Sequence, residues 1–573
     1  WLEYLLSIFL CMVTMADQRN ALILQPCNGA GAEERTSWPR ARLRDLHSAL
    51  SNLRRFWQDM RSGGGPQNDP MSMPYSSRDE IRFFFSKGVP LGLAALMNFG
   101  IPPLVAMGFA GHTHNSPRLQ ASLGYARVWY NCTMQMIMNG TLAYFRSAIP
   151  GCIGAGRKDR LPSYFQRSVL LSLLCMLPFY LLQFFAADIM HAFGVPRLNA
   201  EDVGCYCRLM IMTSVVNILN SHIESAFNNL GYAKCSTFNS FVTGLGVDCT
   251  STFLFIYVWR WDMVGAALAR LLVNSFRLSV WCLLTWRYKL AHNIFIVKEP
   301  EAREPLFTMT EFREFRRLGI PQVLTYFSGW LVFELQVMGI ANIKGITQDA
   351  LAASADWVQI ESATAAAQMG WLQSTSMRIL ALLGRQDPGA RDAFFLFQTL
   401  AALSVAIANV FFLLFQDDVC RLISNDTIVQ QWLRKILWIL VLHTQTRVSA
   451  LAPNFLWIPL GRGYRQTLMT FTSFYVIAAP IVGIVGLTDV LTDSVEVKLK
   501  FCVSLATIAQ FVMIIWNSIN LYRLDWQEAG AIVNRRANTD RQRRSVTSRV
   551  SHAKTEQTAS LEDQELQTPA AAA

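Results

Sequence analysis

The sequence is poor in charged residues. Asp, Glu, Lys and Arg make up only 16% of its 573 residues, whereas about a quarter is usual in a soluble domain. Hydrophobic residues make up 52%, and the mean hydropathy is +0.25. A soluble core of this size cannot bury so much apolar side chain, so the composition predicts an integral membrane protein.

Residue patterns that carry chemistry are also scarce. The sequence has only eight histidines, and its twelve cysteines include no CxxC pair and no Cys/His cluster with zinc spacing. No spacing indicates a nucleophile beside its base. We therefore expect no catalytic residues, no metal and no cofactor, and we do not expect an enzyme.

The net charge of +11 does not indicate nucleic-acid binding, because much of the basic excess lies in loops and tails. Basic loops tend to remain on the cytosolic side of a membrane. Their distribution predicts that both chain ends face the cytosol, in the plasma membrane or in a vacuolar or lysosomal membrane. The expected partners are the lipid bilayer and a small-molecule substrate, and we expect a monomer.

Twelve hydrophobic runs are each near the ~20 residues that cross a bilayer as a helix, which predicts an all-α membrane protein with about twelve transmembrane helices. The runs cover residues 86–110, 123–145, 166–188, 209–230, 236–258, 263–286, 318–341, 351–377, 392–415, 436–458, 466–487 and 499–521. Three cytosolic stretches are expected around them: a polar, disordered region at 1–80, a basic connector at 287–317 and a tail at 522–573.

The two halves of this series share short motifs. The letters GVP open the first run at residue 88, and GIP opens the seventh at residue 319. GRKD follows the second run at residue 156, and GRQD follows the eighth at residue 384. Because six spans return the chain to its starting side, the repeat predicts two six-helix lobes, at 86–286 and 318–521, related by a pseudo-two-fold axis along the membrane normal.

Longer motifs occur in a recognisable order. The end of the eighth run, with SMR at 376–378 and LGRQD at 383–387, is similar to the pattern SxRVxNxLGAGD. FAGH at 109–112 is similar to FxGH, and GCIGAG at 151–156, followed by QRS, is similar to GQAFGAG…QRS. VGAALA at 264–269 is similar to xGxALA. In this order the motifs resemble the multidrug and toxic compound extrusion (MATE) family, in its eukaryotic branch, over roughly residues 85–520.

The resemblance implies a V-shaped pair of six-helix lobes that work by alternating access. It implies a secondary transporter that exports organic cations or other amphiphilic xenobiotics and metabolites in antiport with H⁺ or Na⁺. An alternative is a flippase of the wider superfamily that moves lipid-linked oligosaccharide, which would need a basic cavity. Arg270 and Arg447 mildly favour this alternative, and both are expected to line the cavity together with Trp330.

Carboxylates inside the runs are candidate coupling and substrate residues, because a charge within the membrane is costly and usually functional. Glu334 matches the second acid of the family pattern EWWxxE, whereas Gly329 stands in place of the first. Asp248 lies near the acid that some bacterial relatives carry in their fifth span. Each carboxylate could carry a coupling ion, or it could only bond a neighbouring helix.

Three further residues complete the candidate set. Gln359 stands where the family often has Glu, and Glu361 lies two positions on, about 200° around the helix. Asn131 matches the Asn of the family pattern NVTG. Arg447 needs a buried partner, for which Glu334 and Glu361 are the candidates. Where the family has acids and this sequence does not, as at Gln359 and Gly329, the cavity is expected to be less acidic than in an organic-cation exporter. The substrate could therefore be anionic or zwitterionic, or coupling could be lost.

Overall fold

The computed structural model describes residues 73–111, 116–192, 195–296, 309–423, 427–488 and 493–538. The regular structure in this part of the chain is entirely helical, as the apolar runs predict. Most of the predicted N-terminal region, the middle of the basic connector and the end of the tail lie outside the described residues.

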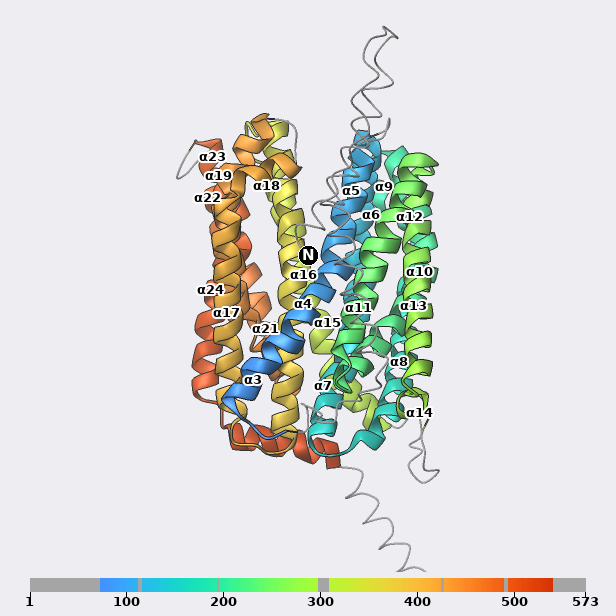
Figure 1. Ribbon diagram of the computed structural model, residues 1–573. Helices are drawn as coiled ribbons and strands as arrows, with labels where there is room; N and C mark the ends of the chain where they lie inside the picture. Colours follow the sequence, from blue (N-terminus) through green and yellow to red (C-terminus); the bar gives the residue numbers. More distant parts are fainter. Residues whose placement is uncertain are drawn as a thin grey trace, which may run out of the picture.

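In the part of the chain that the structure describes, twelve long helical segments form two lobes (Figure 1). The six N-lobe segments follow each other along the chain. The first comprises α3 (Ser77–Phe83), α4 (Val89–Ala95) and α5 (Ile101–Gly111), and the second comprises α6 (Ser116–Tyr130) and α7 (Met136–Gly154). The third is α8 (Leu161–Phe184), the fourth is α10 (Arg197–Asn229), the fifth comprises α11 (Ala233–Phe241) and α12 (Cys249–Thr252), and the sixth is α13 (Asp262–Arg287). In the C-lobe they are α15 (Met309–Ala341), α16 (Gln348–Gly384), α17 (Ala390–Leu414), α19 (Thr427–Leu451), α21 (Gly463–Phe471) and α22 (Ala479–Leu487), and α23 (Val495–Val503) and α24 (Leu505–Tyr522).

Short helices and π-helical turns complete the described architecture. The short helices are α9 (Ala186–Ala192), α14 (Ala291–Ile294), α18 (Gln416–Ile423), α20 (Asn454–Trp457) and the 3-10 turn η5 (Lys158–Arg160). The π-helical turns within the long segments are η2 (Phe84–Gly88), η3 (Leu96–Gly100), η4 (Asn131–Gln135), η6 (Val242–Asp248), η7 (Phe253–Val258) and η9 (Thr472–Ala478).

Apolar content divides the twelve segments into two groups. Eight of them contain a stretch that is long and apolar enough to cross a membrane. The other four are built on α7, α15, α16 and α19. These four carry charged residues in their middle, such as Glu361 in α16 and Arg447 in α19, which lower their hydropathy. The segments with the weakest apolar signal therefore hold most of the candidate site.

Two predicted boundaries are wrong at the start of the lobes. Helix α3 begins at Ser77, inside the stretch predicted to be disordered up to residue 80, because Glu80 enters a buried ion pair with Arg378 of α16. Helix α15 begins at Met309, inside the predicted connector, because its first turns pack on α7. The hydropathy pattern does not predict where these two helices begin, because the first turns of both helices are polar on one face.

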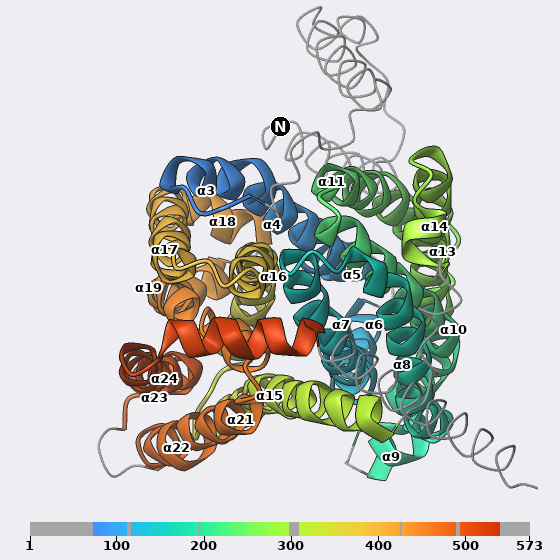
Figure 2. The same ribbon diagram turned by 90° about the horizontal axis from the view of Figure 1, so that it is seen from below.

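The predicted tail also begins with a helix, over residues 526–538. Its residues Ala529, Val533 and Ala537 recur every fourth position, and all three are buried. This spacing places them on one helix face. Figure 2 shows this helix lying across the end of the molecule, from the C-lobe toward the N-lobe.

Each lobe receives the first turns of the other lobe's first span. Helix α3 lies beside α17 of the C-lobe (Figure 2), where the rings of Phe83 and Phe397 are 6.0 Å apart. Helix α15 begins against α7 of the N-lobe, where the rings of Phe315 and Tyr144 are 5.6 Å apart. The lobes are therefore interlocked at this end by aromatic contacts.

We call this end, which carries the starts of α3 and α15 and helix 526–538, the inner end, because the loop charges predict that it faces the cytosol. The opposite end, at α9 and α18, is the outer end. At the inner end a Cβ added to Gly154 of α7 would lie 2.0 Å from the carbonyl oxygen of Ala381 of α16. A Cβ on Gly384 would lie 2.3 Å from the carbonyl oxygen of Gly151. These glycines let the two backbones touch, which closes the inner end.

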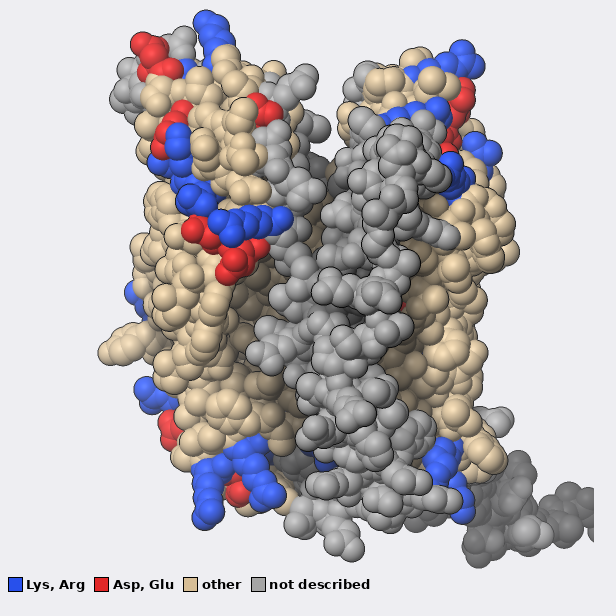
Figure 3. Space-filling view, turned by 45° about the horizontal axis from the view of Figure 1, so that its top comes forward, with Lys and Arg blue, Asp and Glu red and all other residues tan. Residues whose placement is uncertain are grey.

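The outer end has the opposite character. Figure 3 shows the two lobes standing apart there, with a hollow between them. Contact between the lobes at the inner end and separation at the outer end describe an outward-facing arrangement.

Candidate functional site

A buried ionic cluster lies inside the C-lobe. Arg447 of α19 forms an ion pair with Glu361 of α16, and the Nε2 atom of His443 lies 3.4 Å from the same carboxylate. The side chains of all three are at most 4% exposed. A carboxylate and a guanidinium at this depth require each other, because neither charge is stable alone in a low dielectric. Glu361 is one of the two partners that the sequence predicted for Arg447.

Polar and aromatic side chains surround this cluster. His443 Nε2 accepts a hydrogen bond from Arg447, so His443 Nδ1 donates to the hydroxyl of Thr507 at 3.2 Å, which is the pattern of a neutral imidazole. Gln510 lies 3.4 Å from the same Nε2 and accepts a 2.6 Å hydrogen bond from Thr446. The cluster is therefore a connected network spanning α16, α19 and α24.

Some hydrogen-bonding capacity in this region stays unused. The Nη1 atom of Arg447 and the Nε1 atom of Trp357 are buried and have no hydrogen-bond partner among the described residues. The ring of Trp357 lies 5.9 Å from that of His443. Most buried donors in proteins are paired, so these two N–H groups remain able to bond another group.

The N-lobe holds a second, separate ion pair. Asp248 ends the π turn η6 and is buried, and Arg270 of α13 reaches it with Nη1 at 3.3 Å and 3.4 Å from the two carboxylate oxygens. The Arg270 side chain remains 21% exposed. The buried Arg277 of α13 lies 3.4 Å from the Thr243 hydroxyl of η6. Asp248 and Glu361 thus lie in different lobes, each bound to an arginine.

A contact between the lobes involves one residue that the sequence analysis missed. Arg127 of α6 donates a hydrogen bond through Nη1 to the side-chain oxygen of Gln359 of α16. Gln359 therefore faces the N-lobe, while Glu361 faces α19, as the 200° separation on the helix predicts. The available signal was a lone arginine inside the second hydrophobic run.

The structure describes fewer contacts for the remaining predicted residues. The backbone of Glu334 lies in α15, and its side chain lies outside the described part of the structure. Asn131 begins the π turn η4 and is half-buried. Trp330 is half-buried, and its ring lies 6.3 Å from that of Phe333, which in turn contacts the ring of His443.

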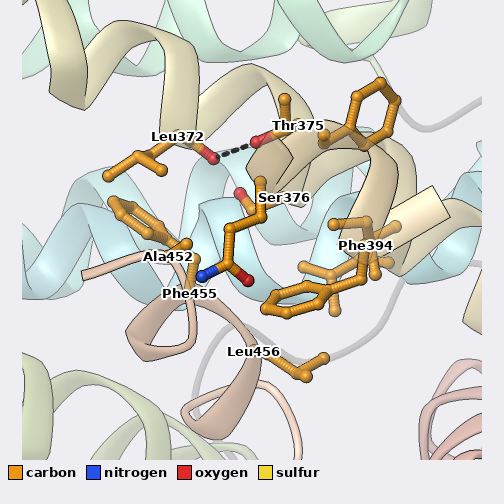
Figure 4. Close-up of a pocket in the computed structure, with 11 residues that line it drawn as sticks. Leu372, Thr375, Ser376, Phe394, Ala452, Phe455 and Leu456 are labelled. Atoms are coloured by element: carbon orange, nitrogen blue, oxygen red, sulfur yellow. Dashed lines mark hydrogen bonds between the residues drawn. The ribbon is translucent and has the colours of Figure 1, made fainter. Parts of the chain in front are cut away.

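A small pocket lies elsewhere in the C-lobe (Figure 4). Leu372, Thr375, Phe394 and Leu456 are among the side chains around it, and the Thr375 hydroxyl donates to the carbonyl oxygen of Leu372 at 3.0 Å. Its lining is mostly apolar, and it includes none of the predicted site residues. We therefore do not assign it to the candidate site.

These geometries define a class of protein: a helical membrane protein of two lobes, closed at one end, with ion pairs buried inside each lobe. Known proteins share this architecture. A model of the MatE family matches residues 104–248. The Arabidopsis thaliana protein DETOXIFICATION 37 is 24% identical over 322 residues, which is 54% of this chain and 60% of that protein, so the match spans less than two thirds of the relative.

Solved structures extend the likeness to most of the chain. The eukaryotic MATE transporter AtDTX14 superposes with a TM-score of 0.68 at 14% identity, over 80% of this chain and 99% of that one. An outward-facing multidrug resistance MATE transporter gives 0.66 at 15% identity, over 80% and 98%. A MOP superfamily transporter from Pyrococcus furiosus, described by the reverse polarity of its binding pocket, gives 0.67 at 14% identity, over 80% and 98%. The chain is thus similar to the MatE family in sequence over residues 104–248, and it shares the fold of solved MATE transporters over most of its length.

Proposed function

We propose that the chain is a secondary active transporter that exports small amphiphilic solutes by alternating access, in antiport with H⁺ or Na⁺. The observation that carries the proposal is the buried network of Glu361, Arg447 and His443. A network of charges inside a lipid-embedded lobe is costly, and ion coupling gives a reason for its presence.

The coupling step follows from the charges. A proton that reaches Glu361 neutralises the carboxylate and breaks its ion pair with Arg447. Because His443 is neutral, the charge of Arg447 is then uncompensated, and the packing of α16 on α19 that depends on this pair is weakened. A sodium ion at the carboxylate would have the same effect.

Helix α16 connects this step to the lobe interface. The same helix carries Glu361 toward α19, Gln359 toward Arg127 of the N-lobe, and Ala381 against Gly154 at the inner end. A displacement of α16 relative to α19 therefore reaches the inter-lobe contacts at two depths. In this proposal, ion binding and the opening of the lobes both act through α16, and its contacts with both lobes support the idea.

The proposal is tested by flux from proteoliposomes loaded with two probes, the organic cation ethidium and the organic anion carboxyfluorescein, under an imposed pH or Na⁺ gradient. Wild type is expected to move at least one probe, and an ionophore that collapses the gradient should stop it. Glu361→Gln should lower gradient-driven flux at least tenfold, because the amide cannot take up the ion.

Glu334→Gln tests the acid that the sequence singled out, and it should also reduce coupling. The half-buried outer-end variant Glu496→Gln serves as the control and should leave flux unchanged, because its partners Lys435 and Lys500 lie outside the network. Folded wild-type protein that moves neither probe under either gradient would overturn the proposal.

A flippase for lipid-linked oligosaccharide is the second candidate, favoured by the exposed part of Arg270. It predicts translocation of a pyrophosphate-linked lipid without any ion gradient. Gradient-dependent movement of a water-soluble probe separates the two functions.

A further inference from the structure

Helix 526–538 lies across the inner end and contacts both lobes (Figure 2). It follows α24 of the C-lobe after a short connection, residues 523–525. Asp525 caps its start, because Asp525 Oδ1 accepts hydrogen bonds from the backbone N–H groups of Gln527 and Glu528 at 2.8 Å and 3.2 Å. The helix therefore begins as a continuation of the C-lobe.

One face of this helix packs on the C-lobe. The ring of Trp526 lies 5.7 Å from that of Phe394 in α17. A Cβ added to Gly530 would lie 3.4 Å from a carbonyl oxygen of α16, so the two backbones pass close to each other. Asn534 donates a 2.6 Å hydrogen bond to the carbonyl oxygen of Gly384. Residues 526, 530 and 534 recur every fourth position and therefore share this face.

The last turns of the helix contact the N-lobe. A methyl carbon of Val533 lies 2.7 Å from the position that a Cβ on Gly151 of α7 would take. Arg160 of η5 donates hydrogen bonds to the carbonyl oxygens of Arg536 and Ala537 at 3.4 Å and 3.2 Å. The last carbonyl groups of a helix have no partner within the helix, and a cation there also opposes the negative end of the helix dipole. The N-lobe thus supplies the cap for this end of the helix.

Side-chain contacts strengthen the attachment to the N-lobe. Arg536 Nε lies 3.3 Å from one carboxylate oxygen of Glu314, at the start of α15. The Tyr164 hydroxyl of α8 donates to the other Glu314 oxygen at 3.5 Å. The guanidinium of Arg160 lies 5.1 Å from the centre of the Tyr164 ring. Because Arg160 also reaches the last carbonyls of the helix, these four residues form a closed ring of contacts.

These two sets of contacts cannot both persist once the lobes separate at the inner end. The start of the helix is joined to α24 and packs on α16 and α17, so it stays with the C-lobe. Resting on the alternating access proposed above, we infer that helix 526–538 is a latch. It is anchored on the C-lobe, and its last turns hold the N-lobe while the inner end is closed and release it in the inward-facing state.

The chemistry of the latch allows it to open reversibly. Most of its contacts with the N-lobe are polar, and they lie at the end of the molecule rather than in the apolar middle of a lobe. When the last turns leave, water can hydrogen-bond to the exposed carbonyls and to the guanidinium of Arg160, so that no charge remains buried without a partner. The latch therefore favours the outward-facing state without fixing it.

Hydrogen exchange of the full chain in detergent tests the latch from the N-lobe side. Gly151→Ala places a Cβ 2.7 Å from a methyl carbon of Val533, which is closer than two unbonded carbons can lie. Because valine in a helix strongly prefers one rotamer, the last turns of the latch helix must move away. Backbone exchange should become at least threefold faster than in wild type at 151–160, 381–387 and 533–538.

Further variants separate the latch from damage to α7. Val533→Ala removes the methyl groups that the new Cβ meets, so Gly151→Ala/Val533→Ala should exchange close to the wild-type rate. Arg160→Gln removes the cation from the last carbonyls and should speed exchange as Gly151→Ala does. Residues 529–532 should stay protected in both loosened variants, because this part of the helix packs on the C-lobe. The control Gln527→Ala, on the exposed face, should leave exchange unchanged.

Two outcomes would overturn the latch. In the first, exchange rises in 533–538 while 151–160 and 381–387 stay as protected as in wild type, so that the helix leaves without opening the inner end. In the second, the double variant exchanges as fast as Gly151→Ala, which traces the effect to α7 itself. Neither measurement needs a substrate, so failure of the transport proposal shows separately, as the absence of probe flux in wild type.

Discussion

At the scale of single residues, Glu80 and Arg378 show how strongly buried charges depend on each other in this protein. Arg378 Nε lies 3.0 Å from both carboxylate oxygens of Glu80, and both side chains are at most 2% exposed. Arg378 also donates to the carbonyl oxygens of Met73 and Pro74 at 3.1 Å and 3.4 Å. The guanidinium therefore fixes the first turn of the N-lobe to the C-lobe.

Glu80→Gln should destabilise the protein by about 3 kcal/mol, because the substitution keeps the size of the side chain but leaves the buried charge of Arg378 uncompensated. Thermal unfolding in detergent measures this loss. The matched control is Glu201→Gln, whose partner Arg197 and own side chain are 81% and 58% exposed. It should cost less than about 0.5 kcal/mol, since exposed pairs contribute little. Equal losses in the two variants would contradict the account.

The sequence identifies charged residues inside the membrane but not all their partners. Asp248, Glu361 and Arg447 stand out because each interrupts an apolar run. Which of these residues form ion pairs depends on which helix faces meet. A single sequence predicts a partner only where few oppositely charged residues are available, as for Arg447. Glu80 escapes notice because it lies before the first run, where acids are ordinary.

At the scale of elements, the length of an apolar run predicts where a helix crosses the membrane, but it does not predict where that helix begins or ends. Helix α16 runs from Gln348 to Gly384, whereas its apolar run covers only 351–377. The helix continues at the inner end because Ala381 and Gly384 pack on glycines of α7. Such contacts are tertiary, and hydropathy does not register them. The π turns are equally invisible, since they change the hydrogen-bond partner and not the apolar pattern.

At the scale of the whole molecule, the internal repeat predicts two lobes because paired motifs recur at equal spacing, and the structure confirms them. The exchange of first turns between the lobes and the bridging helix 526–538 are not predictable in this way. They arise from polar segments next to the membrane, where composition is typical of loops. The outward-facing state is likewise a property of packing between lobes.

The most direct test of alternating access is a reversible lock across the inner end. A Cβ on Gly151 would lie 2.7 Å from a methyl carbon of Val533, so Gly151→Cys with Val533→Cys brings two thiols within reach of a disulfide. Oxidation would then tie helix 526–538 to α7, and wild type, oxidised in parallel, controls for the native cysteines. Gradient-driven probe flux should stop on oxidation and return on reduction. Flux that continues undiminished in fully cross-linked protein would contradict transport by separation of the lobes.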